Sequence, residues 1–245
     1  MALELSCVAG FVDAIGYIAL YHVYVANMSG NTIAIAVEPT QGKWDLFFRR
    51  GAAVPFFVFG MLLSKCAVHW TERQKFRYLP AVVYGAEALL LGLFVWLGAD
   101  RVSGGEVNAP LLEYYFLLAL LSLAMGLQNT LHTHFGQFNL HTTHVTGTLA
   151  KFTDEIAQFL FWFTERARAG RRLGRILVVS KRQRAFRDAA VLGAVWLCYA
   201  GGAFAGALLL QSWGIFSLTV PAFLLVFLAV ADMIKPMALA ARAES

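Results

Sequence analysis

Charge is scarce in this chain: charged residues make up 14% of its 245 residues, whereas 59% are hydrophobic. A soluble domain of this size typically carries about 25% charged residues, so the composition excludes a water-soluble globular protein. Cysteines are few as well, with three in isolated apolar surroundings, and they form neither a disulfide framework nor a CxxC motif. We therefore interpret Cys7, Cys66 and Cys198 as small buried hydrophobic residues.

The chain also lacks the short motifs of common enzyme classes. It contains no G-x-S-x-G, no H-E-x-x-H, no P-loop and no dinucleotide-binding fingerprint. Its first residues lack the basic region and the cleavage site of a signal peptide, so we expect the first span to be retained. We expect neither enzymatic activity nor a cofactor.

Long apolar runs are what the sequence has instead, and several exceed the roughly 18 residues that cross a bilayer. They predict an all-α polytopic membrane protein with six principal spans. The first and fourth spans are too long for one plain helix, so we expect each to be broken, tilted or re-entrant. The predicted spans cover residues 5–38, 51–71, 78–99, 111–150, 188–211 and 213–234.

A polar motif occurs twice within this apolar sequence, about half a chain apart. The first copy is Gly10-Phe-Val-Asp13 with Asn27-Met-Ser-Gly-Asn-Thr32, and the second is Gly126-Leu-Gln-Asn129 with His144-Val-Thr-Gly-Thr-Leu149. Polar groups are costly in hydrocarbon, so a repeated polar cluster indicates a site. The copies divide the chain into two predicted membrane repeats, 1–110 and 111–245, the second with a basic cytoplasmic loop at 165–187.

The distribution of Lys and Arg predicts the topology. With the N-terminus inside, fifteen basic residues fall inside and four outside, which agrees with the positive-inside rule and makes both termini cytoplasmic. Nine of the twenty lie between Arg166 and Arg187, beside a span, which favours a role in topology or lipid binding over nucleic-acid binding. Three spans per half would make the halves inverted repeats. In an eight-span alternative, Ile33–Val37 and its counterpart each complete a crossing.

Four short motifs follow one another in the order of a known family. They are Gly-Phe-Val-Asp-Ala at 10–14, Val-Ala-Asn-Met-Ser-Gly-Asn-Thr at 25–32, Met-Gly-Leu-Gln-Asn at 125–129 and Thr-Thr-His-Val-Thr-Gly-Thr-Leu at 142–149. Together they resemble the YoaK-like family of bacterial inner-membrane proteins, grouped under a domain of unknown function. The resemblance implies a six-span protein of the inner (plasma) membrane, often regarded as a transporter, and supplies no substrate. The chain departs from it in a His-rich second motif and a long basic loop.

The candidate substrate site combines hydroxyls, amides and one carboxylate. We expect Ser29 and Thr146 to cap short helices whose N-termini face the membrane centre and favour an anion there. Tight helix packing is the alternative role for Gly30 and Gly147. The predicted binding residues are Asp13, Asn27, Ser29, Gly30, Asn31, Thr32, Gln128, Asn129, Thr143, Thr146, Gly147 and Thr148.

Asp13 and Glu87 are acids inside apolar spans, where a carboxylate is expected to be paired, protonated or hydrated. Since intramembrane acids often carry protons, we predict that Asp13 couples protons to transport. The alternative for Asp13 is a structural hydrogen bond to another helix. Gln128 and Asn129 occupy the matching place in the second half.

Four histidines enrich the second copy, at His132, His134, His141 and His144. The first pair suits an extended stretch and the second suits one helical turn, and imidazoles bind borderline metals. No cysteine lies near and the spacing matches no metal motif. A metal site is therefore ranked below a pH-sensitive rim or simple loop polarity.

We thus predict a secondary transporter or permease for a small anionic or carboxylated solute, with that solute and the lipid bilayer as partners. The alternative is a membrane sensor or scaffold that acts through the basic loop. A membrane enzyme built on the histidines ranks last. The sequence leaves the substrate, the coupling ion and homo-oligomer formation open.

Overall fold

The computed structural model describes residues 2–74, 77–103, 106–135, 145–169, 179–180, 183–234 and 236. Within them the chain is nearly all helical, since a helix satisfies its own backbone polar groups in an apolar environment. Two short strands, β1 (Val102–Ser103) and β2 (Glu106–Val107), pair antiparallel. The helices are α1 (Ala2–Ala19), α2 (Met28–Val37), η1 (Glu38–Gln41), α3 (Trp44–Gln74), α4 (Leu79–Gly98), α5 (Leu111–Phe135), α6 (Val145–Arg168), α8 (Arg184–Trp213), η2 (Gly214–Leu218) and α9 (Thr219–Ile234).

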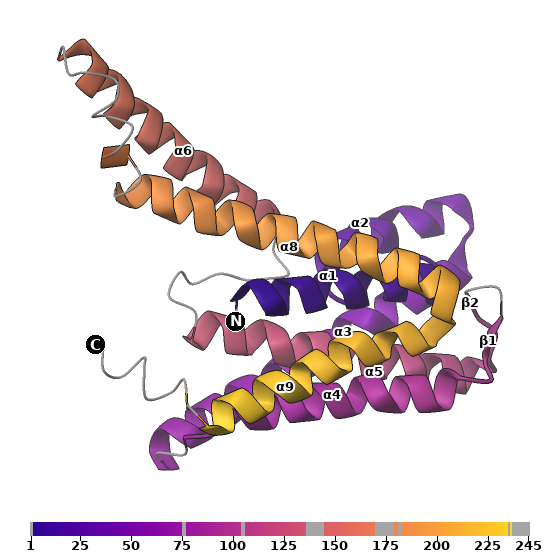
Figure 1. Cartoon of the computed structure of the whole chain (residues 1–245). Coiled ribbons are helices and arrows are strands. Elements are labelled where there is room, and N and C mark those ends of the chain that lie inside the picture. The colour runs from indigo at the N-terminus through magenta and orange to yellow at the C-terminus, as the bar shows by residue number, and fades with distance from the viewer. Residues whose placement is uncertain are drawn as a thin grey trace.

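Five helical stretches of the described chain are long and apolar enough to cross a membrane. They are Ala2–Ala19, Trp44–Thr71, Leu79–Gly98, Leu111–Thr130 and Arg184–Ile234. The last stretch has 51 residues and comprises α8, η2 and α9, and Figure 1 shows the chain turning back at η2. The predicted all-α membrane protein is confirmed at this level.

The turns between helices gather at two ends of the bundle. In Figure 1, α1 starts at the left, where α3 also leads into α4. We call this the N-terminal end. The β1–β2 hairpin between α4 and α5 and the η2 turn lie at the right, the opposite end. Successive long helices therefore run back and forth between two ends.

The start of α3 differs from the prediction. The helix begins at Trp44, seven residues before the predicted span, so Arg49 and Arg50 are helical rather than part of an outer loop. Two aromatic rings stabilise the charge of Arg49. Its guanidinium lies 4.5 Å from the ring centre of Tyr21 and 4.3 Å from the ring centre of Tyr114. Arg50 pairs at 2.6 Å with the buried carboxylate of Glu38.

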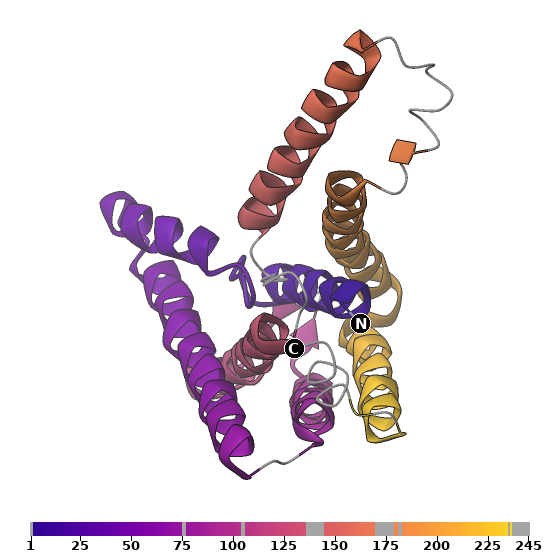
Figure 2. The same ribbon diagram turned by 90° about the vertical axis from the view of Figure 1, so that its left-hand side faces the viewer.

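The second part of the predicted fourth span belongs to a longer helix. Its polar part forms α6, a 24-residue helix that is not among the candidate spans of the described chain. Beyond the predicted span, α6 carries Lys151, Asp154 and Glu155, and it packs mainly against α8. Figures 1 and 2 show it projecting from the bundle beside the first half of α8. α6 and α8 also take up both ends of the predicted loop 165–187.

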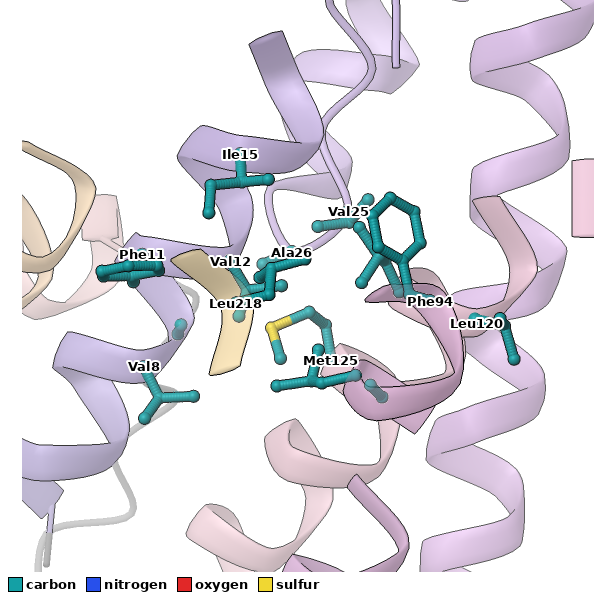
Figure 3. Close-up of a cluster of buried hydrophobic side chains, with 14 of the residues drawn as sticks. Val8, Phe11, Val12, Ile15, Val25, Ala26, Phe94, Leu120, Met125 and Leu218 are labelled. Atoms are coloured by element: carbon teal, nitrogen blue, oxygen red, sulfur yellow. The ribbon is translucent and has the colours of Figure 1, made fainter. Parts of the chain in front are cut away.

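The core lies between α1, α4, α5 and the segment that follows α1. Figure 3 shows side chains from these elements meeting around Met125. Val25 and Ala26 from the segment after α1 are buried in this core, at 0% and 3% exposure. The prediction that all three cysteines are buried is wrong, because Cys66 is exposed on α3 and Cys7 and Cys198 are only partly buried.

Glycines allow α1 and α8 to approach each other closely. A β-carbon added at Gly10 would lie 2.0 Å from the carbonyl oxygen of Tyr199 and 3.1 Å from the nitrogen of Ala203. From the other side, one added at Gly202 would lie 2.1 Å from the carbonyl oxygen of Cys7. The two backbones are thus in direct contact, as in small-residue packing of membrane helices.

α5 crosses α3 in the same way. A β-carbon at Gly126 would lie 2.2 Å from the carbonyl oxygen of Phe57 and 3.0 Å from the nitrogen of Met61, and one at Gly60 would lie 2.5 Å from the carbonyl oxygen of Leu123. In each crossing the motif glycine approaches two residues that are four positions apart on the partner helix. The glycine of that partner helix in turn approaches the residue three positions before the motif glycine, which is Cys7 in α1 and Leu123 in α5. The first glycines of both motif copies therefore pack in one register.

Candidate functional site

The first motif copy surrounds a non-helical segment between α1 and α2. Tyr21 and His22 both have left-handed backbone angles, with φ of 54° and 62°. Asp13, which is 4% exposed, holds the following residues: its Oδ1 accepts hydrogen bonds from the N–H groups of Val25 and Ala26, both at 2.8 Å. Such backbone is tolerated at membrane depth because protein buries and satisfies it.

A hydroxyl from α8 completes the partners of Asp13. The phenol of Tyr199 donates to Asp13 Oδ2 at 2.8 Å, so both carboxylate oxygens are engaged. This contact joins α1, α8 and the segment before α2. Asp13 therefore has the geometry of the structural alternative, and its proposed role in proton coupling stays a prediction.

Asn31 holds the same segment from the other side. Its Oδ1 accepts from the Tyr24 N–H at 3.0 Å and its Nδ2 donates to the Tyr24 carbonyl at 2.6 Å. The side chain is 0% exposed. The Asn31 amide thus pairs with both the N–H and the carbonyl of Tyr24, as the backbone of a neighbouring β-strand would.

The start of α2 differs from the predicted cap. The helix begins at Met28, so Asn27 is the N-cap residue and Ser29 belongs to the first turn. The Asn27 side chain makes no capping hydrogen bond within the described chain, and its Oδ1 accepts instead from the Ser29 hydroxyl at 2.7 Å. The exposed Thr32 donates to the carbonyl of Met28 at 2.8 Å. The Asn27 side chain thus leaves the first N–H groups of α2 uncapped.

The two motif copies meet at one cavity of about 340 Å³, which we call the motif cavity. Phe57, at the middle of the candidate span Trp44–Thr71, also lines it. Thr146 is exposed in the first turn of α6 and does not cap that helix, because α6 starts one residue earlier. The lining residues are Ala26, Asn27, Met28, Ser29, Phe57, Val145 and Thr146.

Other predicted residues lie beside the motif cavity without lining it in the described chain. Gly30 packs against a ring, since a β-carbon there would lie 2.9 Å from two ring carbons of Tyr24. This contact favours tight packing as its role. In α6, Gly147 is exposed and Thr148 is 4% exposed. The structure thus brings together only part of each motif copy.

Gln128 and Asn129 lie elsewhere in the described bundle and tie helices together. Gln128 Nε2 donates to the carbonyl of Leu5 in α1 at 2.6 Å, and Asn129 Nδ2 lies 3.1 Å from the sulfur of Met61 in α3. Neither lines the motif cavity among its described residues. The predicted grouping of these amides with Asp13 is therefore not seen at the cavity.

Part of the histidine-rich stretch lies outside the described residues, namely Thr143, His141 and His144. His132 and His134 lie in α5, and their side chains are also outside the described part. The spacing of this pair suits an extended stretch, whereas α5 is helical to Phe135. Elsewhere, the described residues contain no group of three or more His, Cys, Asp or Glu side chains that could hold a metal.

Tyr199 and Phe57 are site residues that the sequence did not single out. Tyr199 lies 186 residues from the carboxylate that it contacts, and Phe57 enters the cavity from a span without a polar motif. One signal was available for Tyr199: a phenol in an apolar span needs a hydrogen-bond partner. The sequence offers no comparable signal for Phe57.

Comparison with known proteins identifies the family of the chain. Residues 1–231 match the family described as "Protein of unknown function (DUF1275)". The chain is similar to the UPF0700 transmembrane protein YoaK of Bacillus subtilis (strain 168), with 29% identity over 161 residues, which is 65% of this chain and 68% of that protein. No solved structure matches it. The chain therefore belongs to the DUF1275 family of YoaK-like membrane proteins.

Proposed function

We propose that this chain is a secondary transporter or permease that binds a small anionic or carboxylated solute in the motif cavity. One observation carries the proposal: residues 27–29 of the first motif copy and residues 145–146 of the second line a single cavity at the middle of a candidate span. Transporters built from repeats bind their substrates at such a place, between broken helices near the bilayer midplane.

The chemistry of the described lining favours an anion. Two helix N-termini, those of α2 and α6, border the cavity, and their first N–H groups carry partial positive charge. Asn27, Ser29 and Thr146 add amide and hydroxyl groups. A volume of about 340 Å³ fits a small solute.

The proposal includes six crossings arranged as two inverted three-span repeats in the inner membrane, with both termini cytoplasmic. The matched register of the α1–α8 and α5–α3 glycine contacts supports an internal repeat. The first motif helix of each half, α1 and α5, runs in opposite directions in Figure 1, which supports inversion. The clustering of Lys and Arg supports the cytoplasmic placement of the N-terminal end.

Uptake by the purified chain in liposomes tests the proposal, with a panel of organic and inorganic anions under a proton gradient. We expect Ser29→Leu to abolish uptake because the larger side chain fills the motif cavity. Thr32→Leu is the matched control, since Thr32 is exposed on the same helix and is not part of the described lining. If no anion of the panel is moved by the wild type, or if the two variants behave alike, the proposal is wrong.

A second candidate function is a membrane scaffold that acts through α6 and the basic stretch after it. Phe159 and Trp162 of α6 stack with ring centres 5.8 Å apart, Phe186 of α8 lies 5.3 Å from Phe159, and the Arg166 guanidinium lies 4.6 Å from the Trp162 ring centre. Aromatic and basic groups together suit a lipid interface. Deleting residues 170–178 separates the functions: scaffold activity would be lost while solute uptake persists.

A further inference from the structure

Glu87 is a buried acid without a partner. It lies in the interior of the candidate span Leu79–Gly98, is 0% exposed, and neither carboxyl oxygen has a hydrogen-bond partner in the described chain. At about 1.5 Å per residue, it is roughly 12 Å from the start of α4, which brings it near the middle of a hydrocarbon layer about 30 Å thick.

The surroundings of Glu87 do not suit a negative charge. An ionised carboxylate in a low-dielectric interior must be paired and hydrogen-bonded, or it takes up a proton and becomes neutral. Asp13 provides the contrast within the same protein, because two backbone N–H groups and one phenol engage its oxygens. The oxygens of Asp13 are thus hydrogen-bonded, whereas those of Glu87 have no such partner in the described chain, so Glu87 needs a proton.

A series of polar groups leads from Glu87 toward the N-terminal end of the bundle. Tyr84 lies three residues earlier on α4, on the same side of the helix, and is 2% exposed. Toward that end, Asp232 of α9 lies beside the first turn of α4, and Glu4 lies in the first turn of α1. Asp232 is 1% exposed and accepts from the N–H of Ala81 at 3.1 Å, whereas Glu4 is exposed.

The other elements packed on α4 add little charge near Glu87 within the described chain. η2 contains no charged residue, and Glu113 of α5 pairs with Arg101 at the opposite end. Lys65 and Arg73 of α3 are exposed. The described titratable groups that face the pair of Glu87 and Tyr84 are thus Asp232 and Glu4.

We propose that Glu87 is a proton-binding site inside the bundle, loaded and unloaded through Tyr84 from the N-terminal end. Loading transfers one proton from water at that end to the carboxylate, which becomes a neutral acid. No hydrogen bond joins the Tyr84 phenol to Glu87 in the described chain, so the transfer requires these two side chains, one helical turn apart, to come into contact. The phenol oxygen then accepts the incoming proton while its own proton passes to Glu87. Unloading reverses these steps, and no electron is transferred.

Infrared spectroscopy of the full chain in lipid bilayers, recorded against pH and without any solute, tests the proposal. We expect the band of a protonated carboxyl at neutral pH in the wild type. Glu87→Gln, which keeps the shape of the side chain, should remove that band, whereas Asp13→Asn should keep it. A wild type without the band at neutral pH, a band that survives in Glu87→Gln, or a band lost in Asp13→Asn overturns the proposal.

The relay has its own test. Tyr84→Phe should keep the carboxyl band but slow its shift on transfer into deuterated water, because the ring lacks the hydroxyl that passes the proton. An unchanged exchange rate in Tyr84→Phe contradicts the relay. Because neither measurement involves a transported solute, failure of the proposed transport function and failure of this inference are distinguishable.

Discussion

Adjacent glycines in α8 offer a sharp test of the helix crossings. A β-carbon at Gly202 would lie 2.1 Å from the carbonyl oxygen of Cys7 and 2.8 Å from its carbonyl carbon, whereas one at Gly201 would meet no atom within 4 Å. The contacted atoms are backbone, so α1 and α8 must move apart by about 1 Å to restore an ordinary C···O distance of about 3.3 Å. Gly202→Ala is the perturbation, and Gly201→Ala is its matched control.

The expected magnitudes follow from two opposing terms. Overpacking typically costs about 1–3 kcal/mol, and replacing a helical glycine by alanine gains about 0.5–1 kcal/mol. Gly202→Ala should therefore lower the free energy of unfolding by up to about 2.5 kcal/mol, or by more where α1 cannot move. Gly201→Ala should be neutral or raise it by up to about 1 kcal/mol.

Equilibrium unfolding in detergent micelles, followed by circular dichroism, measures both changes. The same comparison applies in α3, where Gly60→Ala would bring a β-carbon to 2.5 Å from the carbonyl oxygen of Leu123 while Gly51→Ala meets nothing within 4 Å. If Gly201→Ala and Gly202→Ala unfold alike, the backbone contact between α1 and α8 is absent and the argument from matched register fails.

Three further predictions concern the first motif copy and the topology. Asn31→Leu removes both hydrogen bonds to the partly buried backbone of Tyr24 and should destabilise the fold by about 1–3 kcal/mol in thermal unfolding. Asp13→Leu should cost more than Tyr199→Phe, because it strips three hydrogen bonds instead of one, and equal melting temperatures would refute this ranking. Cysteines placed at Lys43 and Arg73 should react with impermeant thiol reagents from opposite sides of the membrane; labelling from one side would refute an odd number of crossings between them.

Features encoded by short stretches of sequence were the ones that could be predicted. The span predicted at 78–99 matches α4 (Leu79–Gly98) because an apolar run of this length, with Glu87 as its one charged residue, is stable in a bilayer as a helix. The break in the first long segment was predicted for the same reason, since its length exceeds one crossing. Residues 20–27 form that break between α1 and α2.

Features that depend on distant partners could not be predicted. The helical placement of Arg49 relies on the ring of Tyr114, and the satisfaction of Asp13 relies on Tyr199. The sequence shows that these charged residues lie in apolar runs, but it does not show which distant side chains contact them. The length of α6 could not be predicted for another reason. Its charged residues are also typical of a loop, whereas the structure shows a helix that packs on α8 and continues to Arg168.

For the proposed transport function, the geometry limits how Asp13 could act. Its carboxylate does not line the motif cavity among the described residues, but it holds the N–H groups of Val25 and Ala26, directly before the cavity-lining Asn27. A proton on Asp13 would remove the charge that strengthens those hydrogen bonds and loosen the segment that positions the start of α2. Glu87 has no such partners in the described chain, so a proton bound there would have no comparable effect on that segment. Coupling through Asp13 would thus change the shape of the cavity, whereas Glu87 would only store the proton.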